Sequence, residues 1–228
     1  MLTKSQEKLI KSLNTKKGRK ESGLCLVEGK KVIELASKFV DYTFQSKDTK
    51  EFKKLVTTEA PQAMAAVAKI PKWQKFDIIQ KDIIVVLDGV QDPGNVGSIL
   101  RLCFGFNASL VLVESADPAN PKVIRSSVGT MFKVPWISVT QNKINGLIKE
   151  LHRPIYLLEK KLKSKEFKQA KIKKPIILVA GSEGNGIRLS IKGESVYLNH
   201  NIELESLNVG QALAIALYLL HDRSLVSD

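Results

Sequence analysis

The chain after residue 81 carries the clearest pattern of hydrophobic and polar positions. Short, mostly apolar runs recur there, separated by polar or glycine-containing segments. A run of this kind without polar alternation is typical of a strand buried on both faces, as in a parallel sheet. Apolar residues at helical spacing fill the intervals, so the pattern predicts an α/β fold, a largely parallel sheet wrapped by helices. The predicted strands are 83–87, 109–113, 155–158, 176–180 and 195–198, and the predicted helices are 96–104, 144–151 and 211–220.

The first seventy residues predict shorter elements in alternation. Apolar positions indicate a helix over 4–13, a strand over 24–27 and a helix after Gly29. A strand over 39–44 and a short helix or strand over 52–56 follow, before an alanine-rich segment bracketed by prolines. Alternation of this kind indicates a small α/β domain. We expect three parts, namely a small domain over 1–75, a polar linker over 76–81 and a second domain over 82–228.

The first helix of the second domain has one distinctive polar position. Its apolar stripe consists of Val96, Ile99, Leu100, Cys103 and Phe104. At 3.6 residues per turn, Arg101 lies roughly 130° from the centre of that stripe. Arg101 shares its side of the helix with Gly97, where a missing side chain would leave room for a ligand. An ordinary exposed arginine is the alternative interpretation.

A glycine-rich turn follows the predicted strand 176–180. The turn 181–186 contains three glycines, which allow a backbone to approach a ligand closely. Polar residues 205–210 then lead into the last helix, so a small-molecule pocket is plausible, although such turns also occur without a ligand. A dinucleotide-dependent oxidoreductase is not favoured, because no GxGxxG follows the strand 83–87. The turn is not a Walker A loop either, since no lysine and hydroxyl residue follow it.

The net charge of +13 and the isoelectric point near 9.6 indicate a polyanionic partner. Lys16–Lys20 predicts a basic turn suited to RNA phosphate, and Arg125–Gly129 either binds phosphate or turns the chain. The segment 160–174 holds eight lysines against Glu166 and is expected to be a solvated basic loop. A generally lysine-rich surface without a polyanionic partner is the alternative.

The remaining composition points to an ordinary protein of the cytoplasm. Cys25 and Cys103 lie far apart in apolar sequence, as expected of buried thiols in a reducing compartment. The three histidines show no metal-ligand spacing, so no metal is expected. The N-terminus lacks the apolar core of a signal peptide, and the longest apolar run, 212–220, is too short to span a membrane.

Three segments in this order resemble the SpoU branch of the SPOUT methyltransferases. They are Asn95–Arg101 with Gly105 after it, Val179–Gly186, and Ser206–Val209 before an alanine-rich helix. Residues 125–132 also fit the family pattern, and residues 4–70 look more loosely like the small substrate-binding domain of many members. Two positions depart from it: Asn199-His200 follow Leu198 where Pro-Met is common, and Gly210 replaces a frequent serine.

The resemblance implies an enzyme that moves a methyl group from S-adenosylmethionine to a ribose 2′-hydroxyl of RNA. It implies a trefoil knot in the catalytic domain and a homodimer, with no metal and no membrane. The catalytic set would be Asn95, Arg101, Glu183, Ser206 and Asn208, and the cofactor would be held by Gly181, Leu198 and Leu207. RNA contacts are expected at Lys16, Lys17, Arg19, Lys20 and Arg125.

The role of Arg101 stays open at this point. A guanidinium pKa above about 12 makes a neutral arginine rare. Arg101 therefore either takes the proton, orients the hydroxyl or grips a phosphate, with Asn95 and Glu183 orienting it. Ser206 and Asn208 are expected to cap the last helix and shape the pocket. Ribosomal RNA is favoured as the substrate; transfer RNA, or a non-catalytic RNA-binding protein of the same fold, are the alternatives.

Overall fold

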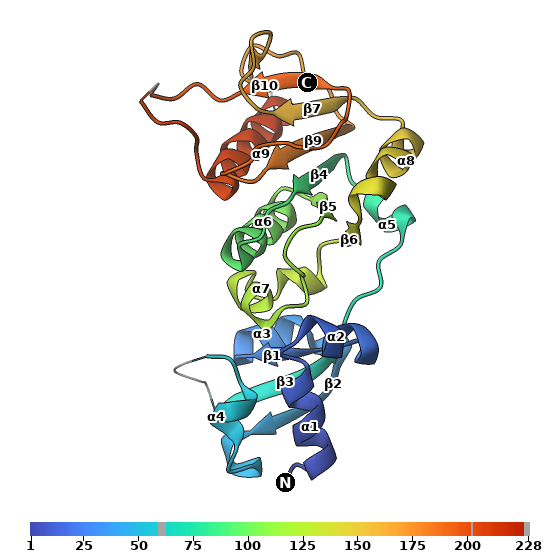
Figure 1. The fold of residues 1–228 in the computed structure, drawn as a ribbon, viewed down its shortest axis with the longest axis vertical. Helices are drawn as coiled ribbons and strands as arrows, with labels where there is room; N and C mark the ends of the chain where they lie inside the picture. The colour runs from blue at the N-terminus through green and yellow to red at the C-terminus, as the bar shows by residue number, and fades with distance from the viewer. Residues whose placement is uncertain (59–62, 202, 226–228) are drawn as a thin grey trace.

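The computed structural model describes residues 1–58, 63–201 and 203–225. Its strands form two separate sheets, one from the first seventy residues and one from the rest (Figure 1). We call residues 1–70 the front unit. Among its described residues, three antiparallel strands lie in the order β1-β3-β2. The strands are β1 (Leu24–Glu28), β2 (Val40–Gln45) and β3 (Met64–Lys69), and the helices are α1 (Lys4–Ser12), α2 (Lys16–Ser22), α3 (Lys30–Leu35) and α4 (Phe52–Leu55), with 3-10 turns at Ser37–Phe39 and Ser46–Asp48.

The part of the chain described after residue 81 contains a sheet of seven parallel strands, as the apolar runs predict. Their order is β6-β5-β4-β9-β7-β10-β8. The strands are β4 (Ile83–Asp88), β5 (Ala108–Val113), β6 (Trp136–Val139), β7 (Ile155–Leu158), β8 (Lys165–Glu166), β9 (Ile176–Gly181) and β10 (Glu194–Tyr197). The helices are α5 (Lys75–Ile79), α6 (Pro93–Gly105), α7 (Pro121–Ser126), α8 (Gln141–Leu151) and α9 (Val209–Leu225), with a 3-10 turn at Thr130–Phe132.

The strand order reverses between β4 and β9. The chain runs outward from β4 through β5 to β6, and the later strands lie on the other side of β4. In register, Asp88 at the end of β4 lies opposite Val113 at the end of β5 and Gly181 at the end of β9. Ligands of open parallel sheets bind outside the carboxyl ends of the strands at such a reversal. The topology therefore places a candidate site beside Asp88 and Gly181.

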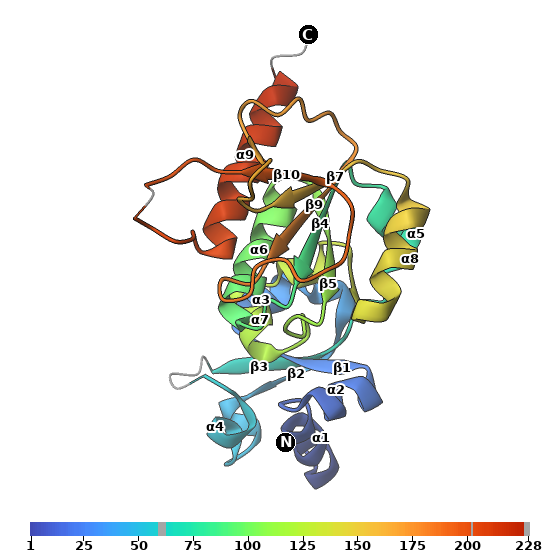
Figure 2. The same ribbon diagram turned by 45° about the horizontal axis from the view of Figure 1, so that its top comes forward.

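Helices cover both faces of the parallel sheet (Figure 2). On one face, α5 and α8 bury their apolar side chains, including Ile78 and Ile148, against Ile84 and Val86 of β4. On the other face, α6, α7 and α9 pack against the alternate side chains of the same strand, and the front unit joins this core through β1 and α3. Burial on both faces explains why the strand sequences lack polar alternation.

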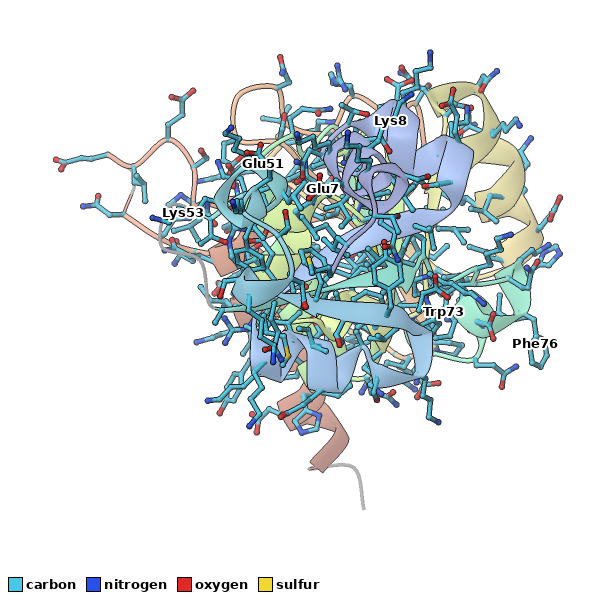
Figure 3. All side chains as sticks on the ribbon, turned by 90° about the horizontal axis from the view of Figure 1, so that it is seen from below. Glu7, Lys8, Glu51, Lys53, Trp73 and Phe76 are labelled. Carbon is cyan, nitrogen blue, oxygen red and sulfur yellow. The ribbon has the colours of Figure 1, made fainter. Side chains whose placement is uncertain are left out.

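The N-terminal end of the front unit carries charges of both signs. Figure 3 shows Glu7, Lys8, Glu51 and Lys53 on this side. Glu51 pairs with Lys54 at 3.0 Å, and hydrogen bonds from that lysine help to lower the pKa of the Glu51 carboxyl. A surface of mixed charge does not favour a polyanion, so this end is not the expected RNA face.

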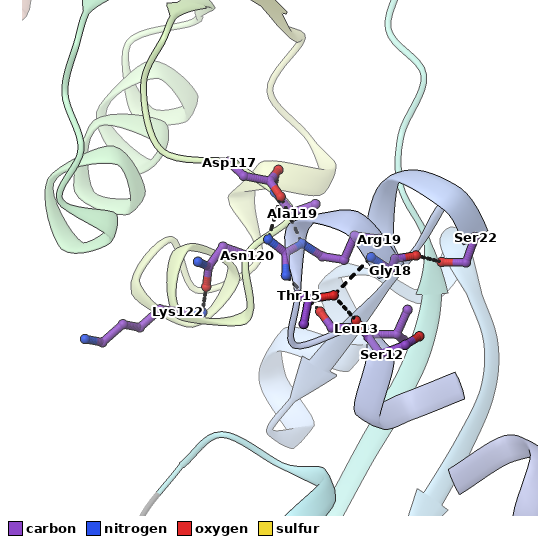
Figure 4. Close-up of polar contacts among 10 residues, drawn as sticks. All are labelled: Ser12, Leu13, Thr15, Gly18, Arg19, Ser22, Asp117, Ala119, Asn120 and Lys122. Atoms are coloured by element: carbon purple, nitrogen blue, oxygen red, sulfur yellow. Dashed lines mark hydrogen bonds and ion pairs between the residues drawn. The ribbon is translucent and has the colours of Figure 1, made fainter. Parts of the chain in front are cut away.

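The predicted basic turn 16–20 is instead helix α2, and Arg19 within it is buried. The guanidinium donates to Asp117 Oδ2 from Nε at 2.9 Å and from Nη2 at 2.7 Å, and to the Leu13 carbonyl from Nη1 at 2.8 Å (Figure 4). Asp117 follows β5, so this ion pair fastens the front unit to the parallel sheet. The prediction that Arg19 contacts RNA is wrong, because its donors are directed inward and only 3% of the residue is exposed.

We expect Arg19→Ala to lower the free energy of unfolding by about 2–3 kcal/mol, because it leaves the half-buried Asp117 carboxylate without its partner. Urea denaturation measures this loss. The matched control is Lys17→Ala, since the Lys17–Glu21 pair is exposed and its atoms are 3.9 Å apart. That variant should stay within about 0.5 kcal/mol of the parent protein. Equal losses in both variants would contradict a structural role for Arg19.

Several other segments differ from the sequence expectations. The predicted linker 76–81 holds most of α5, and the segment without helix or strand is 70–74. The pattern did not predict β3, α7 or β6. The segment 160–174 is not wholly solvated, because it contains β8 and because Phe167 is buried. The start of the alanine-rich segment, at residues 60 and 61, lies outside the described residues.

Candidate active site

Three residues from distant parts of the chain form one hydrogen-bonded cluster at the strand reversal. Asn95 lies in the first turn of α6, Glu183 in the loop after β9, and Asn208 directly before α9. Asn95 Nδ2 donates to Glu183 Oε1 at 2.8 Å. Asn208 Nδ2 lies 3.0 Å from both Asn95 Oδ1 and Glu183 Oε1. Three of the five predicted catalytic residues therefore meet in one chain, and we call them the amide–carboxylate cluster.

Helix starts hold two members of this cluster in place. The Asp92 side chain accepts from the backbone N–H of Asn95 at 2.7 Å and so caps α6, with Pro93 as the first helical residue. Asn208 Oδ1 accepts from Gly210 N at 2.9 Å, which makes Asn208 the cap of α9. Among the described residues, Ser206 makes no such capping bond. The expectation of a cap is thus met by Asn208 alone.

The predicted cofactor residues lie around adjoining hollows beside this cluster. Gly181 and Glu183 line a hollow of about 370 Å³ together with Leu207. Leu198 and Leu207 line a second hollow of about 150 Å³, and Ser206 lies on the wall of both. The structure therefore brings all three predicted cofactor positions and Ser206 to one place.

Only glycine fits at Gly181. A Cβ added there would lie 2.0 Å from the carbonyl carbon and oxygen of Gly186 and 2.4 Å from the nitrogen of Ile187. The turn is closed by a hydrogen bond from Gly186 N to Ser182 O at 2.8 Å. This close approach of two backbone segments shapes the wall of the larger hollow.

Sequence reasoning missed Asp88, which holds the far end of the glycine-rich turn. Its side chain is 2% exposed, and Oδ2 accepts from the backbone N–H groups of Arg188 and of Leu189, the latter at 2.9 Å. The Arg188 guanidinium lies 3.7 Å from the other carboxylate oxygen. An acidic residue ending a fully apolar strand was the available signal, because such a carboxylate needs buried donors.

We expect Asp88→Ala to lower the free energy of unfolding by about 2–3 kcal/mol, because two backbone N–H groups lose their acceptor and Leu189 is buried. Urea denaturation with and without S-adenosylmethionine measures the effect. The exposed Asp41 on β2 provides the control, and Asp41→Ala should leave stability nearly unchanged. A stable Asp88→Ala protein would show that the turn keeps its shape without the carboxylate.

Arg101 lies apart from the amide–carboxylate cluster within one chain. It is an exposed side chain on α6, two turns after Asn95, and makes no hydrogen bond or ion pair with the described residues. Gly97 does not leave room for a ligand, because a Cβ there would lie 1.9 Å from Ser126 Oγ. That expectation is wrong, since the space beside Gly97 is filled by α7. Phe104, expected in the buried stripe, is 54% exposed.

The predicted RNA contacts fall into two groups. Lys16 and Lys20 are exposed on α2, and Lys17 pairs weakly with Glu21. Arg125 belongs to α7 and donates to Thr57 Oγ1 at 2.9 Å. Its Nη1 also lies 3.6 Å from Glu28 Oε1, so it joins α7 to the front unit.

The described residues offer neither a reactive thiol in α6 nor a metal-ligand cluster. Burial raises the pKa of the Cys103 thiol to about 12, which keeps it neutral inside α6. Within the described ranges, no three His, Cys, Asp or Glu side chains gather as metal ligands would. A helix long and apolar enough to cross a membrane is likewise not found among those residues.

Comparison with known proteins identifies relatives along nearly the whole chain. Residues 82–218 match the model of the SpoU rRNA Methylase family. A 23S rRNA (guanosine(2553)-2'-O)-methyltransferase of Bacillus subtilis (strain 168) is 30% identical over 241 residues, which cover 92% of this chain and 93% of that protein. A 23S rRNA (adenosine(1067)-2'-O)-methyltransferase of Streptomyces laurentii is 30% identical over 178 residues, with 74% of this chain and 65% of that protein covered.

Solved structures share the fold over the same extent. One from Porphyromonas gingivalis, assigned to the TrmH family of RNA methyltransferases, has a TM-score of 0.82 at 27% identity and covers 98% of this chain and 99% of its own. An AdoMet-bound rRNA methyltransferase from Sinorhizobium meliloti has a TM-score of 0.87 at 21% identity and covers 100% of this chain and 97% of its own. The family model covers most of the part of the chain that forms the parallel sheet, and one relative aligns with nearly the whole chain. The chain therefore belongs to the SpoU rRNA methylase family.

Proposed function

We propose that this protein methylates a ribose 2′-hydroxyl of ribosomal RNA with S-adenosylmethionine as the methyl donor. One observation carries the proposal: the three predicted cofactor positions line two adjoining hollows, and the larger one also borders Glu183 of the amide–carboxylate cluster. The relatives named as 23S rRNA 2′-O-methyltransferases support ribosomal RNA over transfer RNA.

The residues around the hollows fit this cofactor. The closed turn at Gly181 offers backbone groups at a position that any side chain would fill. Leu158, Leu207 and Ala212 give both hollows apolar walls, and Glu159 and Lys160 are charged groups on the same walls. When bound, S-adenosylmethionine would supply an electrophilic methyl carbon on a positively charged sulfur.

The chain's own contribution to the reaction is positioning and charge. Glu183 brings a carboxylate to the cluster, where Asn95 and Asn208 fix its orientation by hydrogen bonds. Fixed groups of this kind hold an RNA ribose in attack geometry without reorganising during the reaction. Arg101 carries the remaining role, to orient the hydroxyl, grip a phosphate or accept the proton.

We also propose that two parts of the chain have different roles, one in binding the RNA and one in methyl transfer. Residues 1–75 would hold the RNA substrate-binding domain and residues 82–228 the methyltransferase domain. The segment without helix or strand, 70–74, lies at the end of the first of these parts, and α5 fills most of 76–81. The separate front sheet and its own apolar core around Phe44 and Leu55 support this division. A trefoil knot in the second domain is consistent with β9, which lies between the earlier strands β4 and β7.

A homodimer is proposed through the face made by α6 and α9. These helices lie side by side in Figures 1 and 2 and pack together. Their outer surface exposes Phe104 at 54%, Ile215 at 44% and Tyr218 at 58%, although large apolar side chains favour burial. Because Arg101 lies three residues before Phe104, this interface would also supply a neighbour for it. Sedimentation of the parent protein and of Tyr218→Arg tests the pairing, and a monomeric parent would contradict it.

The function is tested by incubating the protein and labelled S-adenosylmethionine with ribosomal and transfer RNA from a strain that lacks the gene. Transfer to ribosomal RNA, followed by mapping of one 2′-O-methyl position, supports the proposal. Transfer to transfer RNA alone would favour a tRNA methyltransferase. RNA binding without transfer or cofactor binding would identify a non-catalytic RNA-binding protein.

We place the reaction in the cytoplasm, in keeping with the two buried thiols.

A further inference from the structure

A third hollow lies outside the site described above. It has a volume of about 460 Å³ and separates α2 of the front unit from the carboxyl ends of β5 and β6. Cavities of this size hold small ligands in other proteins. Its walls combine apolar surface from Ile70 and Leu112 with polar groups. The polar groups used below are Lys16, Lys20, Glu114, Ser138 and Thr140. We call it the α2 hollow.

The α2 hollow opens along the same edge of the sheet as the active site. Asp88 at the end of β4 lies in register with Val113 of β5, and Val113 with Val139 of β6. Neighbouring strands are about 4.8 Å apart, so the end of β6 lies about 10 Å from that of β4. Consider an RNA strand with one ribose at the amide–carboxylate cluster. The nucleotides next to that ribose would then lie within reach of the α2 hollow.

Two lysines make one wall of the α2 hollow basic. Lys16 and Lys20 stand four residues apart on α2, so they share a face of the helix. Both are exposed, and neither forms an ion pair with the described residues. Lys17, between them, pairs with Glu21 on another side of the helix and does not line the hollow. Ammonium groups left without a carboxylate partner suit a phosphate.

The opposite wall offers acceptors and is held rigidly. Glu114 has a φ of +44°, a backbone conformation that is costly for a residue other than glycine. The surrounding loop maintains it, because Ser115 Oγ accepts from Val90 N at 3.0 Å and Gln91 donates to the Glu114 carbonyl. The Arg19–Asp117 pair lines the same hollow. The carboxylate of Glu114 is thus presented on a fixed frame.

We propose that the α2 hollow binds a second nucleotide of the substrate RNA, with its phosphate at Lys16 and Lys20 and its base toward Glu114. The proposal rests on the proposed function for the identity of the polymer, but the site itself is argued from the contacts above. A carboxylate accepts hydrogen bonds only, so it selects a base with adjacent N–H donors. Guanine presents two on one edge, and uracil presents one. The site therefore favours guanine and contributes to the choice of RNA sequence.

The test is a nuclear magnetic resonance titration of the isotope-labelled intact protein with guanosine monophosphate and, separately, uridine monophosphate. S-adenosylhomocysteine is added first to occupy the cofactor hollows. We expect saturable, millimolar binding of the guanine nucleotide, with the largest shifts at Lys16, Lys20, Glu114 and Thr140. Shifts confined to the glycine-rich turn, or no saturable shifts, would overturn the proposal. Failure of S-adenosylhomocysteine to bind would count against the proposed function and leave the nucleotide titration interpretable.

Variants separate the phosphate contact from the base contact. Lys16→Ala with Lys20→Ala should weaken binding of both nucleotides about tenfold. The matched control is Lys4→Ala with Lys8→Ala, which removes two exposed lysines of α1 that do not line the hollow and should leave both affinities unchanged. Glu114→Gln should reduce the preference for guanine over uracil and spare the phosphate contact. Equal loss in the α1 double variant would indicate general electrostatic attraction instead of a site. If Glu114→Gln keeps the preference for guanine over uracil, Glu114 does not recognise the base.

Discussion

Arg101→Ala is expected to reduce methyl transfer about a thousandfold while leaving S-adenosylmethionine affinity nearly unchanged. The physical reason is that Arg101 is exposed on α6 and makes no polar contact with the described residues, so its loss removes chemistry and not folding. Single-turnover transfer to ribosomal RNA measures the rate, and calorimetric titration measures cofactor affinity.

Two variants sharpen the Arg101 experiment. Lys149→Ala removes the same charge from an exposed position on α8, which covers the opposite face of the sheet, and should retain full activity. Arg101→Lys keeps the positive charge but loses the planar, bidentate donor set of the guanidinium. Partial activity of this variant would indicate that the charge matters most, and near-zero activity would indicate a bidentate contact. Loss of cofactor binding in Arg101→Ala would contradict the assigned role.

Gly181→Ala is expected to weaken S-adenosylmethionine binding about a hundredfold. The new Cβ would lie 2.0 Å from backbone atoms of Gly186, so the wall of the cofactor hollow must shift. Calorimetric titration gives the affinity, and thermal unfolding shows whether the fold survives.

The matched control for Gly181 lies three residues away in the same turn. A Cβ at Gly184 meets nothing within 4 Å, so Gly184→Ala changes the same residue type without a clash. It should bind the cofactor like the parent protein. If both variants bind normally, the turn adapts to a side chain and Gly181 does not define the hollow.

The parallel sheet could be predicted from the sequence because a strand that is buried on both faces is an unbroken run of apolar residues. The strands 83–87 and 176–180 are buried throughout, as their unbroken apolar runs indicate. The motif residues Asn95, Glu183 and Asn208 were identified by resemblance, and the strand register explains why they meet.

The failures have physical causes that are not local in sequence. Gly18 made α2 look like a turn, yet it lies within the helix. Glycine is required there because α2 packs against the end of α1, where a Cβ would lie 2.1 Å from the Ser12 carbonyl oxygen. Phe104 fits the periodicity of a buried stripe, and periodicity does not show which apolar side chains remain exposed for a partner. Strand β6 was missed because its residues are only half-buried at the edge of the sheet.

The position of β9 has a consequence for how the protein is made. β9 pairs with β4 on one side and β7 on the other, and both partners precede it in the chain. During synthesis at roughly 5–20 residues per second, the edge of β4 therefore waits on the order of ten seconds for its neighbour. That edge is apolar from Ile83 to Leu87, which makes the unfinished chain prone to wrong pairing. We expect this edge to stay unpaired until β9, in the last quarter of the chain, has left the ribosome, the particle whose RNA the finished enzyme is proposed to modify.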